Sequence, residues 1–273
     1  MTKKQPVILV IDVGGTNVKI HAGKQKEPVK IPSGPTMSAR QMVAAVRKAA
    51  AGWKYTAASI GYPGPVLHGK PVTEPHNLGS GWVRFDYQKA LGCPVQLVND
   101  AAMQALGSYE GGRMLFLGLG TGLGSAMIVD GQLEPMELAH LPYKKGSTYE
   151  DYVGLRGLKR LGKKKWRRNV AEVIDQLKKA MAADYVVLGG GNVKLLKKLP
   201  PDTRLGSNMN AFVGGARLWQ ETKERATKPK KSKRAAKSKS AVKAKPASAP
   251  PPAEAVQSEP AADEFVSVEL ATS

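Results

Sequence analysis

Several short segments combine glycines, hydroxyls and carboxylates in patterns that suit phosphate chemistry. In the first, ILVIDVGGTNVKI at residues 8–20, an apolar strand turns through two adjacent glycines into a second strand-like run. Adjacent glycines let backbone amides approach a phosphate closely and adopt positive φ, and the Asp12 carboxylate can hold Mg²⁺ directly or through water. The predicted phosphate-binding residues are Asp12, Gly14, Gly15, Thr16, Asn17 and Lys19. For this motif alone, an ordinary hairpin turn is an equally good interpretation.

A second glycine-rich segment, LGLGTGLGSAMIVDG at residues 117–131, again contains a strand, a turn and a strand. Its predicted phosphate-binding residues are Gly120, Thr121 and Gly122. It is not a P-loop, because GKS or GKT is missing, and it is not a Rossmann fingerprint, because a strand instead of a helix follows the turn. Two such hairpins indicate a duplicated phosphate clamp with one hairpin in each of two lobes, which weakens the interpretation as simple turns.

Between the hairpins, PVQLVNDAAMQALG at residues 94–107 brings Asn99 and Asp100 to the start of a helix that begins near Ala101. At the end of a strand, Asp100 can accept a hydroxyl proton while that oxygen attacks a terminal phosphoryl group. A helix N-terminus favours anions, so we expect this carboxylate to stay ionised. The alternative is that Asp100 only caps the helix, and for this segment taken alone the alternative is the better prediction.

These segments need an α/β framework to position them, and the hydrophobic pattern predicts one. Strands are predicted at Val7–Val13, Ala58–Tyr62, Val95–Asn99, Met114–Leu119, Ser125–Val129 and Tyr185–Leu188. Helices are predicted at Ser38–Ala51, Ala101–Tyr109, Trp166–Ala182 and Phe212–Gln220. Residues 221–273 are rich in Lys, Ala and Ser and then in Pro, Ala and acids, and this composition predicts a disordered tail.

The composition is strongly basic, with 42 Lys and Arg against 22 Asp and Glu. Such a field concentrates polyanions such as nucleic acid, anionic lipid, nucleotide or inorganic polyphosphate, without identifying one of them. The single cysteine, Cys93, excludes an intrachain disulfide and a Cys-rich zinc module. No export signal and no apolar run of membrane-spanning length is present, so we expect a cytoplasmic protein without a membrane partner.

The segments D-V-G-G-T, V-N-D-A and L-G-T-G-L-G, in this order and spacing, resemble the ROK group of sugar kinases and regulators over most of residues 7–219. Within this group, the resemblance is to polyphosphate glucokinases at PHNLGSGW (75–82), ELAHLPY (137–143), TYEDYVG (148–154) and VVLGGGNVK (186–194). It implies a two-lobed, actin-like and hexokinase-like (ribonuclease H-like) ATPase fold. The expected parts are an N-terminal lobe at 1–110, a C-terminal lobe at 111–220 and the tail at 221–273.

By the same resemblance, we expect phosphoryl transfer from polyphosphate or ATP, with Mg²⁺, to the 6-hydroxyl of glucose or a similar hexose. Asp100 would be the general base, beside Asn99. The other expected sugar-binding residues are Gly64, Asn77, Glu137, His140 and Glu150. Carboxylates and an imidazole suit sugar hydroxyls, although Glu137 and His140 would also fit a helical surface pair. The zinc site of many ROK proteins cannot be assembled, because LPYKKGSTYEDYVG contains no cysteine.

Two segments are candidates for binding the phosphoryl donor. The segment GLKRLGKKKWRRN places seven Lys and Arg at positions 159–168, and a basic track there would gain affinity for polyphosphate by counterion release. A solvated basic face is an equally weighted alternative. The donor-binding residues predicted in this run are Lys163, Lys164 and Lys165. Related kinases contact adenosine from a turn that resembles Gly189, Gly190 and Gly191, so the sequence does not decide between ATP and polyphosphate.

Two other functions compete with the kinase. A sugar-responsive ROK regulator would carry a helix-turn-helix before the kinase-like part, and the first strand, at about residue 7, leaves no room for one. We therefore expect no sequence-specific nucleic acid partner. A catalytically inactive sugar-binding protein is disfavoured, because the candidate site retains its carboxylates and its histidine. Related kinases often form homodimers, but the pattern identifies no interface.

Overall fold

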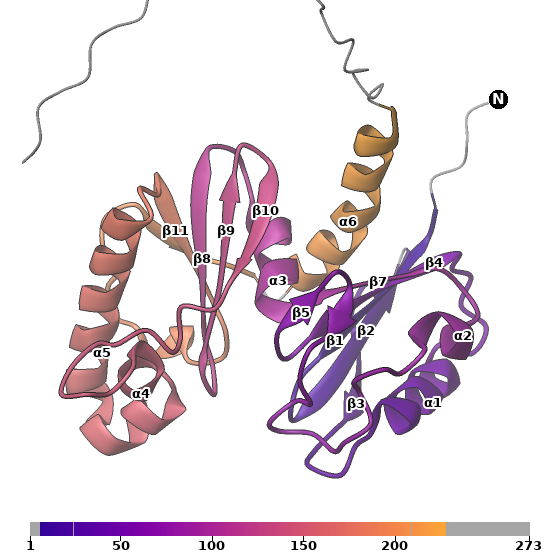
Figure 1. The fold of residues 1–273 in the computed structure, drawn as a ribbon, viewed down its shortest axis with the longest axis horizontal. Helices are drawn as coiled ribbons and strands as arrows, with labels where there is room; N and C mark the ends of the chain where they lie inside the picture. Colours follow the sequence, from indigo (N-terminus) through magenta and orange to yellow (C-terminus); the bar gives the residue numbers. More distant parts are fainter. Residues whose placement is uncertain (1–5, 24, 208, 228–273) are drawn as a thin grey trace, which may run out of the picture. The chain divides into compact units, whose positions relative to one another are not determined.

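The computed structural model describes residues 6–23, 25–207 and 209–227, which form two five-stranded sheets and their helices (Figure 1). The predicted α/β class is confirmed. Strands of the first sheet come from the chain before residue 100, and strands of the second come from the chain after residue 112. A small separate hairpin consists of β5 (Val66–Leu67) and β6 (Lys70–Pro71).

The first sheet is a meander of three strands extended by two parallel ones. Its strand order is β3 (Val29–Pro32), β2 (Asn17–Ala22), β1 (Ile8–Val13), β4 (Ala57–Tyr62) and β7 (Val95–Asn99). β1 runs antiparallel to β2 and parallel to β4, and β4 runs parallel to β7. β1 and β4 are buried along their whole length, as expected for continuous apolar strands in a sheet that is covered on both faces.

The alternation of side chains along β1 divides them between two cores. Leu9 and Ile11 share a core with residues of α1 (Ala39–Ala49) and α2 (Tyr87–Leu91). Their neighbours Ile8 and Val10 instead pack with Met103, Ala211 and Phe212. Successive side chains of a strand point to opposite faces, so one apolar run serves both layers.

The second sheet repeats the topology of the first. Its strand order is β10 (Gln132–Met136), β9 (Leu123–Val129), β8 (Arg113–Leu119), β11 (Tyr185–Gly189) and β12 (Thr203–Leu205). β8 runs antiparallel to β9 and parallel to β11. One face packs on α5 (Leu155–Ala180), with α4 (Tyr149–Val153) beside it, and a short 3-10 helix, η1 (Val193–Leu195), follows β11. The chain therefore folds as two versions of one supersecondary unit.

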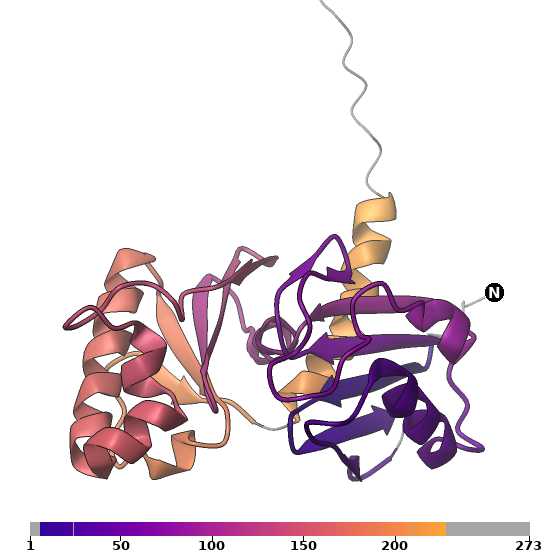
Figure 2. The ribbon, with the colours of Figure 1, turned by 60° about the horizontal axis from the view of Figure 1, so that its bottom comes forward.

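Two helices, α3 (Asp100–Ser108) and α6 (Asn210–Thr227), pack against each other and against strands of both sheets (Figure 2). They cross at Gly107 and Gly214, where an added Cβ would collide with the backbone of the opposite helix. Glycine is therefore required at the crossing. The Ser59 hydroxyl anchors α6 to β4, because it donates to the Gly215 carbonyl at 2.6 Å and accepts from Trp219 Nε1 at 2.9 Å.

Helix α5 differs most from the prediction, because it begins at Leu155 instead of Trp166 and has a non-helical residue, Gly162, with φ 72°. The strands β3, β10 and β12 and the helices α2 and α4 were not predicted, and each has at most five residues. Helix α6 continues to Thr227, so residues 221–227 of the predicted tail are helical. The remainder of that predicted tail, 228–273, lies outside the described residues.

Candidate active site

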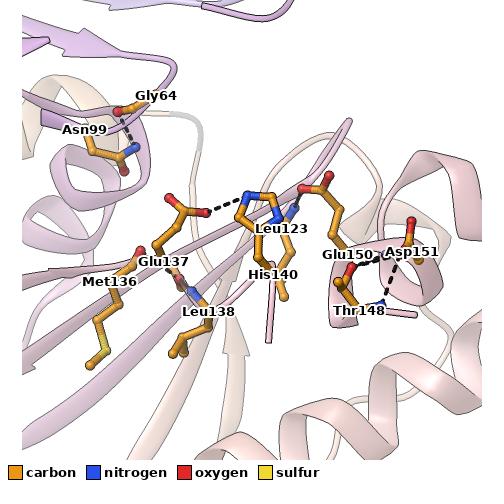
Figure 3. Close-up of polar contacts among 11 residues, drawn as sticks. Gly64, Asn99, Leu123, Met136, Glu137, Leu138, His140, Thr148, Glu150 and Asp151 are labelled. Atoms are coloured by element: carbon orange, nitrogen blue, oxygen red, sulfur yellow. Dashed lines mark hydrogen bonds and ion pairs between the residues drawn. The ribbon is translucent and has the colours of Figure 1, made fainter. Parts of the chain in front are cut away.

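Asn99, the last residue of β7, caps helix α3. Its Oδ1 accepts from the backbone amides of Ala101 at 2.9 Å and Ala102 at 3.1 Å. Its Nδ2 donates to the Gly64 carbonyl at 3.1 Å, which holds the loop after β4 against the start of α3 (Figure 3). Asparagine is among the best N-cap residues. The capping role that the sequence allowed for Asp100 is therefore filled mainly by its neighbour.

Asp100 begins α3, and one of its carboxylate oxygens accepts from the Ala101 amide at 2.8 Å. Burial of the carboxyl raises the pKa of Asp100 to about 7. The negative charge of Asp12 also raises this pKa, whereas hydrogen bonds from the backbone amides of Ala101 and Asp100 lower it. The prediction that the helix N-terminus keeps this carboxylate fully ionised is therefore wrong. Desolvation raises its pKa more than the amides at the start of the helix lower it. Near pH 7 both protonation states are populated.

The first glycine hairpin is fixed by charge and by close packing. Lys19 Nζ pairs with Asp12 Oδ2 at 3.0 Å, across the β1–β2 ladder in which these two residues face each other. Gly14 and Gly15 do not have the positive φ that the sequence suggested. An added Cβ at Gly15 would instead lie 2.8 Å from the Asn77 Cβ. Glycine is thus needed here for close approach, and it brings the turn next to a predicted sugar-binding residue.

The turn also contains the two polar residues predicted to contact phosphate. Thr16 is exposed and Asn17 is half-buried. Their backbones close the turn, because the Gly14 amide donates to the Asn17 carbonyl at 3.1 Å and the Ser33 amide donates to the Thr16 carbonyl at 3.0 Å. Both side chains therefore remain available to a ligand.

The second glycine hairpin contacts the side chain of Glu150. The Leu123 amide donates to Glu150 Oε2 at 3.2 Å, and an added Cβ at Gly122 would collide with the same carboxylate. Glu150 lies in α4, whose start is fixed by a capping box between Thr148 and Asp151 (Figure 3). The predicted hairpin residues and the predicted sugar-binding carboxylate are thus in direct contact.

Glu137 and His140 lie in the loop after β10, not on a helix. His140 Nε2 is 3.8 Å from Glu137 Oε1, and both side chains are largely exposed. Burial raises the pKa of the Glu137 carboxyl, His140 lowers it and Glu150 raises it. Figure 3 shows the Glu137 carboxylate pointing to the His140 ring, with Glu150 on the other side of that ring.

A cavity of about 740 Å³ is lined by residues of the second hairpin, of α4 and α5 and of the loops at residues 76–77 and 140, and we call it the central cavity. It is lined by His76, Asn77, Thr121, Gly122, His140, Thr148, Glu150, Asp151, Leu155, Arg156 and Lys159. Five predicted residues, Asn77, Thr121, Gly122, His140 and Glu150, are among them. The predicted residues Gly64, Asn99, Asp100 and Glu137 are not part of this lining. His76 and the capping residues Thr148 and Asp151 of α4 were not predicted from the sequence. For the two capping residues, the capping-box pattern T-Y-E-D was an available signal.

The predicted donor residues do not gather in one place. Lys163 and Lys164 are exposed and line neither the central cavity nor the hollow that Lys165 lines. Gly190 has φ 87° and packs on the Leu119 backbone, and Asn192 Nδ2 donates to the Gly120 carbonyl at 2.8 Å. Gly189 is buried against Phe116, whereas an added Cβ at Gly191 would meet nothing. This turn therefore supports the second hairpin.

The carboxylates offer limited support for a metal ion. Within the described residues, no group of three or more His, Cys, Asp or Glu is arranged to hold one. Asp12 is buried, and its negative charge raises the pKa of Asp100. A single carboxylate such as Asp12 fits Mg²⁺, which keeps most of its water and takes further ligands from phosphates. No helix within the described part of the chain is long and apolar enough to cross a bilayer.

The repeated sheets with α3 and α6 between them have the actin-like hexokinase fold of ROK sugar kinases, as predicted. The model of the ROK family matches residues 8–135, and the predicted resemblance to this family is confirmed. A polyphosphate glucokinase of Mycobacterium tuberculosis (strain CDC 1551 / Oshkosh) is 27% identical over 220 residues, and the match covers 70% of this chain and 80% of that protein.

Two solved structures with this fold have different activities in their names. One is the inorganic polyphosphate/ATP-glucomannokinase from Arthrobacter sp. strain KM, with a TM-score of 0.66 and 22% identity over 80% of this chain and 99% of that chain. The other is a ROK family transcriptional regulator, a homologue of the E. coli MLC protein, with a TM-score of 0.62 and 16% identity over 79% of this chain and 78% of that chain. At these identities they establish the fold alone.

Proposed function

We propose that this protein is a sugar kinase that transfers a phosphoryl group from polyphosphate or ATP to the 6-hydroxyl of glucose, with Asp100 as general base. The observation that carries the proposal is the state of Asp100. Asn99 takes over most of the capping of α3, and burial with Asp12 raises the pKa of Asp100 to about 7. A base whose pKa lies near the working pH transfers protons efficiently.

In this reaction the sugar hydroxyl oxygen forms a bond to the terminal phosphorus of the donor. Its proton passes to an Asp100 oxygen, and the bond from that phosphorus to the remaining donor phosphate breaks. When bound, Mg²⁺ would neutralise charge on the phosphates, and Asp12 would hold it, in part through water. The polar turns with Thr16 and Thr121 would contact the phosphates. Catalysis here depends on positioning and electrostatics, without a covalent intermediate.

The sugar would lie against Asn77, Glu137, His140 and Glu150. The carboxylates accept hydrogen bonds from hydroxyls, and the imidazole can donate or accept. Glu150 is held by the Leu123 amide, whereas Glu137 is largely exposed and lies beside His140. A pocket of such groups discriminates against analogues that lack a hydroxyl, because polar atoms covered by the bound sugar would then lose their partners.

The first test is the Asp100→Asn variant, assayed with glucose, Mg²⁺ and either ATP or long-chain polyphosphate. Loss of the base is expected to lower kcat by roughly 10²- to 10⁴-fold. Glucose binding, measured by calorimetry, should be retained. The matched control is Asp130→Asn, a residue in the turn after β9 whose φ of 48° asparagine also adopts.

Near-wild-type turnover by Asp100→Asn, with Asp130→Asn also unaffected, would contradict the assigned base. Glucose binding without turnover by the unaltered protein, with either donor, would favour a sugar-responsive regulator or an inactive binding protein.

A further inference from the structure

A second hollow of about 420 Å³ lies beside α5, and we call it the basic groove. It is lined by Lys144, Lys145, Tyr152, Arg160, Leu161, Lys165, Arg168 and Asn169. Five of these residues are cationic and none is acidic. In an uninterrupted helix, residues five apart point about 140° away from each other. The break at Gly162 lets Arg160 and Lys165 line one hollow.

Two of the five cations of the groove are held in place, and the other three form no ion pair within the described residues. Lys144 Nζ pairs with Glu172 at 2.6 Å, and Arg160 donates to the Asp151 carbonyl at 2.9 Å. The other three are Lys145, Lys165 and Arg168. Glu172 offsets the charge of Lys144, so the groove combines the fixed positive charge of Arg160 with side chains that can adapt to an anion.

The basic groove adjoins the central cavity. Consecutive residues face the two hollows, because Asp151 and Lys159 line the cavity whereas Tyr152 and Arg160 line the groove. Arg168 lines both the groove and a third hollow of about 310 Å³, which Arg167, Lys197 and Lys198 also line, and that lining too has no acidic residue. Cations therefore line successive hollows outward from the central cavity.

We propose that the basic groove binds the distal part of a linear polyphosphate chain whose end lies in the central cavity. This inference rests on the proposed function. Of the predicted donor residues Lys163, Lys164 and Lys165, it keeps Lys165 alone and adds cations from other parts of the sequence. A polyphosphate carries a charge on every phosphate, so successive cations gain affinity from it by releasing its counterions.

The chemistry of the groove favours polyphosphate over a nucleic acid or a nucleotide base. Bases bind by stacking on exposed aromatic rings. The Tyr152 ring in this groove is covered by Arg160, whose guanidinium lies 4.9 Å from the ring centroid. A ligand made only of phosphates needs no such surface, and a triphosphate would be too short to use hollows beyond the cavity.

The test compares Lys165→Ala/Arg168→Ala with Arg40→Ala/Arg47→Ala, which removes the same charge from α1. All four residues are exposed and helical, so alanine should preserve the fold. The first variant should raise the KM for long-chain polyphosphate roughly tenfold and leave the KM for ATP and tripolyphosphate unchanged. Direct polyphosphate binding, measured by calorimetry at several salt concentrations, should show a salt slope reduced by about two, one for each lost contact.

A third variant, Lys163→Ala/Lys164→Ala, separates the groove from the sequence run. An equal loss of polyphosphate affinity in this variant or in the α1 control would overturn the proposal, because total charge would then matter and the groove would not. Equal losses with ATP would also overturn it. If the unaltered protein lacks kinase activity, the proposed function fails, whereas calorimetry still shows whether the groove binds polyphosphate.

Discussion

The two glycine hairpins have the same topology, but the first carries a charged residue pair and the second an uncharged one at the matching position. The position is the next-to-last residue pair of each strand ladder, just before the turn. In the first hairpin this pair is Asp12 opposite Lys19, whereas in the second it is Gly118 opposite Gly124. An added Cβ at Gly124 would lie 2.8 Å from the Ala101 Cβ, so the second hairpin reaches the start of α3. One hairpin thus supplies charge near Asp100, and the other supplies close packing against the same helix. A duplicated unit has been adapted to two different tasks.

Among the changes that test the two hairpins, the largest effect is expected from Asp12→Asn, which removes the negative charge from the first hairpin. We expect kcat to fall roughly 10²-fold, since the group that would hold the metal and the phosphates is lost. Removing the negative charge should also lower the pKa of Asp100, because Asp12 raises it. The acidic limb of the pH profile of kcat/KM should therefore move to lower pH. An unchanged limb would show that Asp12 does not act on Asp100.

An intermediate effect is expected from Gly124→Ala, which tests the packing role of the second hairpin. The new methyl group meets Ala101 on α3, and the free energy of unfolding should fall by about 1–2 kcal/mol. Its cross-strand partner provides the control, because a Cβ at Gly118 would lie 3.5 Å from the Phe116 ring, an ordinary contact. Gly118→Ala should change stability by less than about 0.5 kcal/mol. Urea denaturation of both variants measures the difference, and equal stabilities would contradict the packing role.

The smallest effect concerns how Asp100 affects stability. Its folded-state pKa of about 7 lies above the ordinary value of 3.8, so the folded protein holds an extra proton between these values. The contribution of Asp100 to stability therefore falls as pH rises from about 4 to 7. Asp100→Asn should raise the melting temperature at pH 8 by a few degrees and change it little near pH 4. A variant that melts lower than wild type at pH 8 would show that the carboxylate is not desolvated.

Much of the framework could be predicted, because its strands are continuous apolar runs. Val95–Asn99 was predicted with its observed ends, and the strands from Ile8 and from Tyr185 differ by one residue at one end. The order of the hairpins and the position of Asn99 and Asp100 at a helix start also follow from local pattern. These features depend on neighbouring residues alone.

What depends on tertiary structure could not be predicted. The pKa of Asp100 reflects burial and Asp12, whereas the sequence indicated only the helix terminus. The basic run at 159–168 appeared as one patch, but a helix rotates each residue by about 100°, and Gly162 interrupts it. Lysines that are adjacent in sequence therefore reach different surfaces. The central cavity includes His76 and Arg156, which no short motif connects.

The packing of α6 has a consequence for the order in which the chain folds during synthesis. Ile8 and Val10 lie near the beginning of the chain, yet they pack with Ala211 and Phe212. A ribosome makes the first sheet long before it makes these partners, so one apolar face of that sheet must wait for almost the whole folded region to emerge. During this interval the nascent protein exposes an apolar surface to which chaperones can bind. We expect chaperone binding to the N-terminal half to end when α6 leaves the exit tunnel.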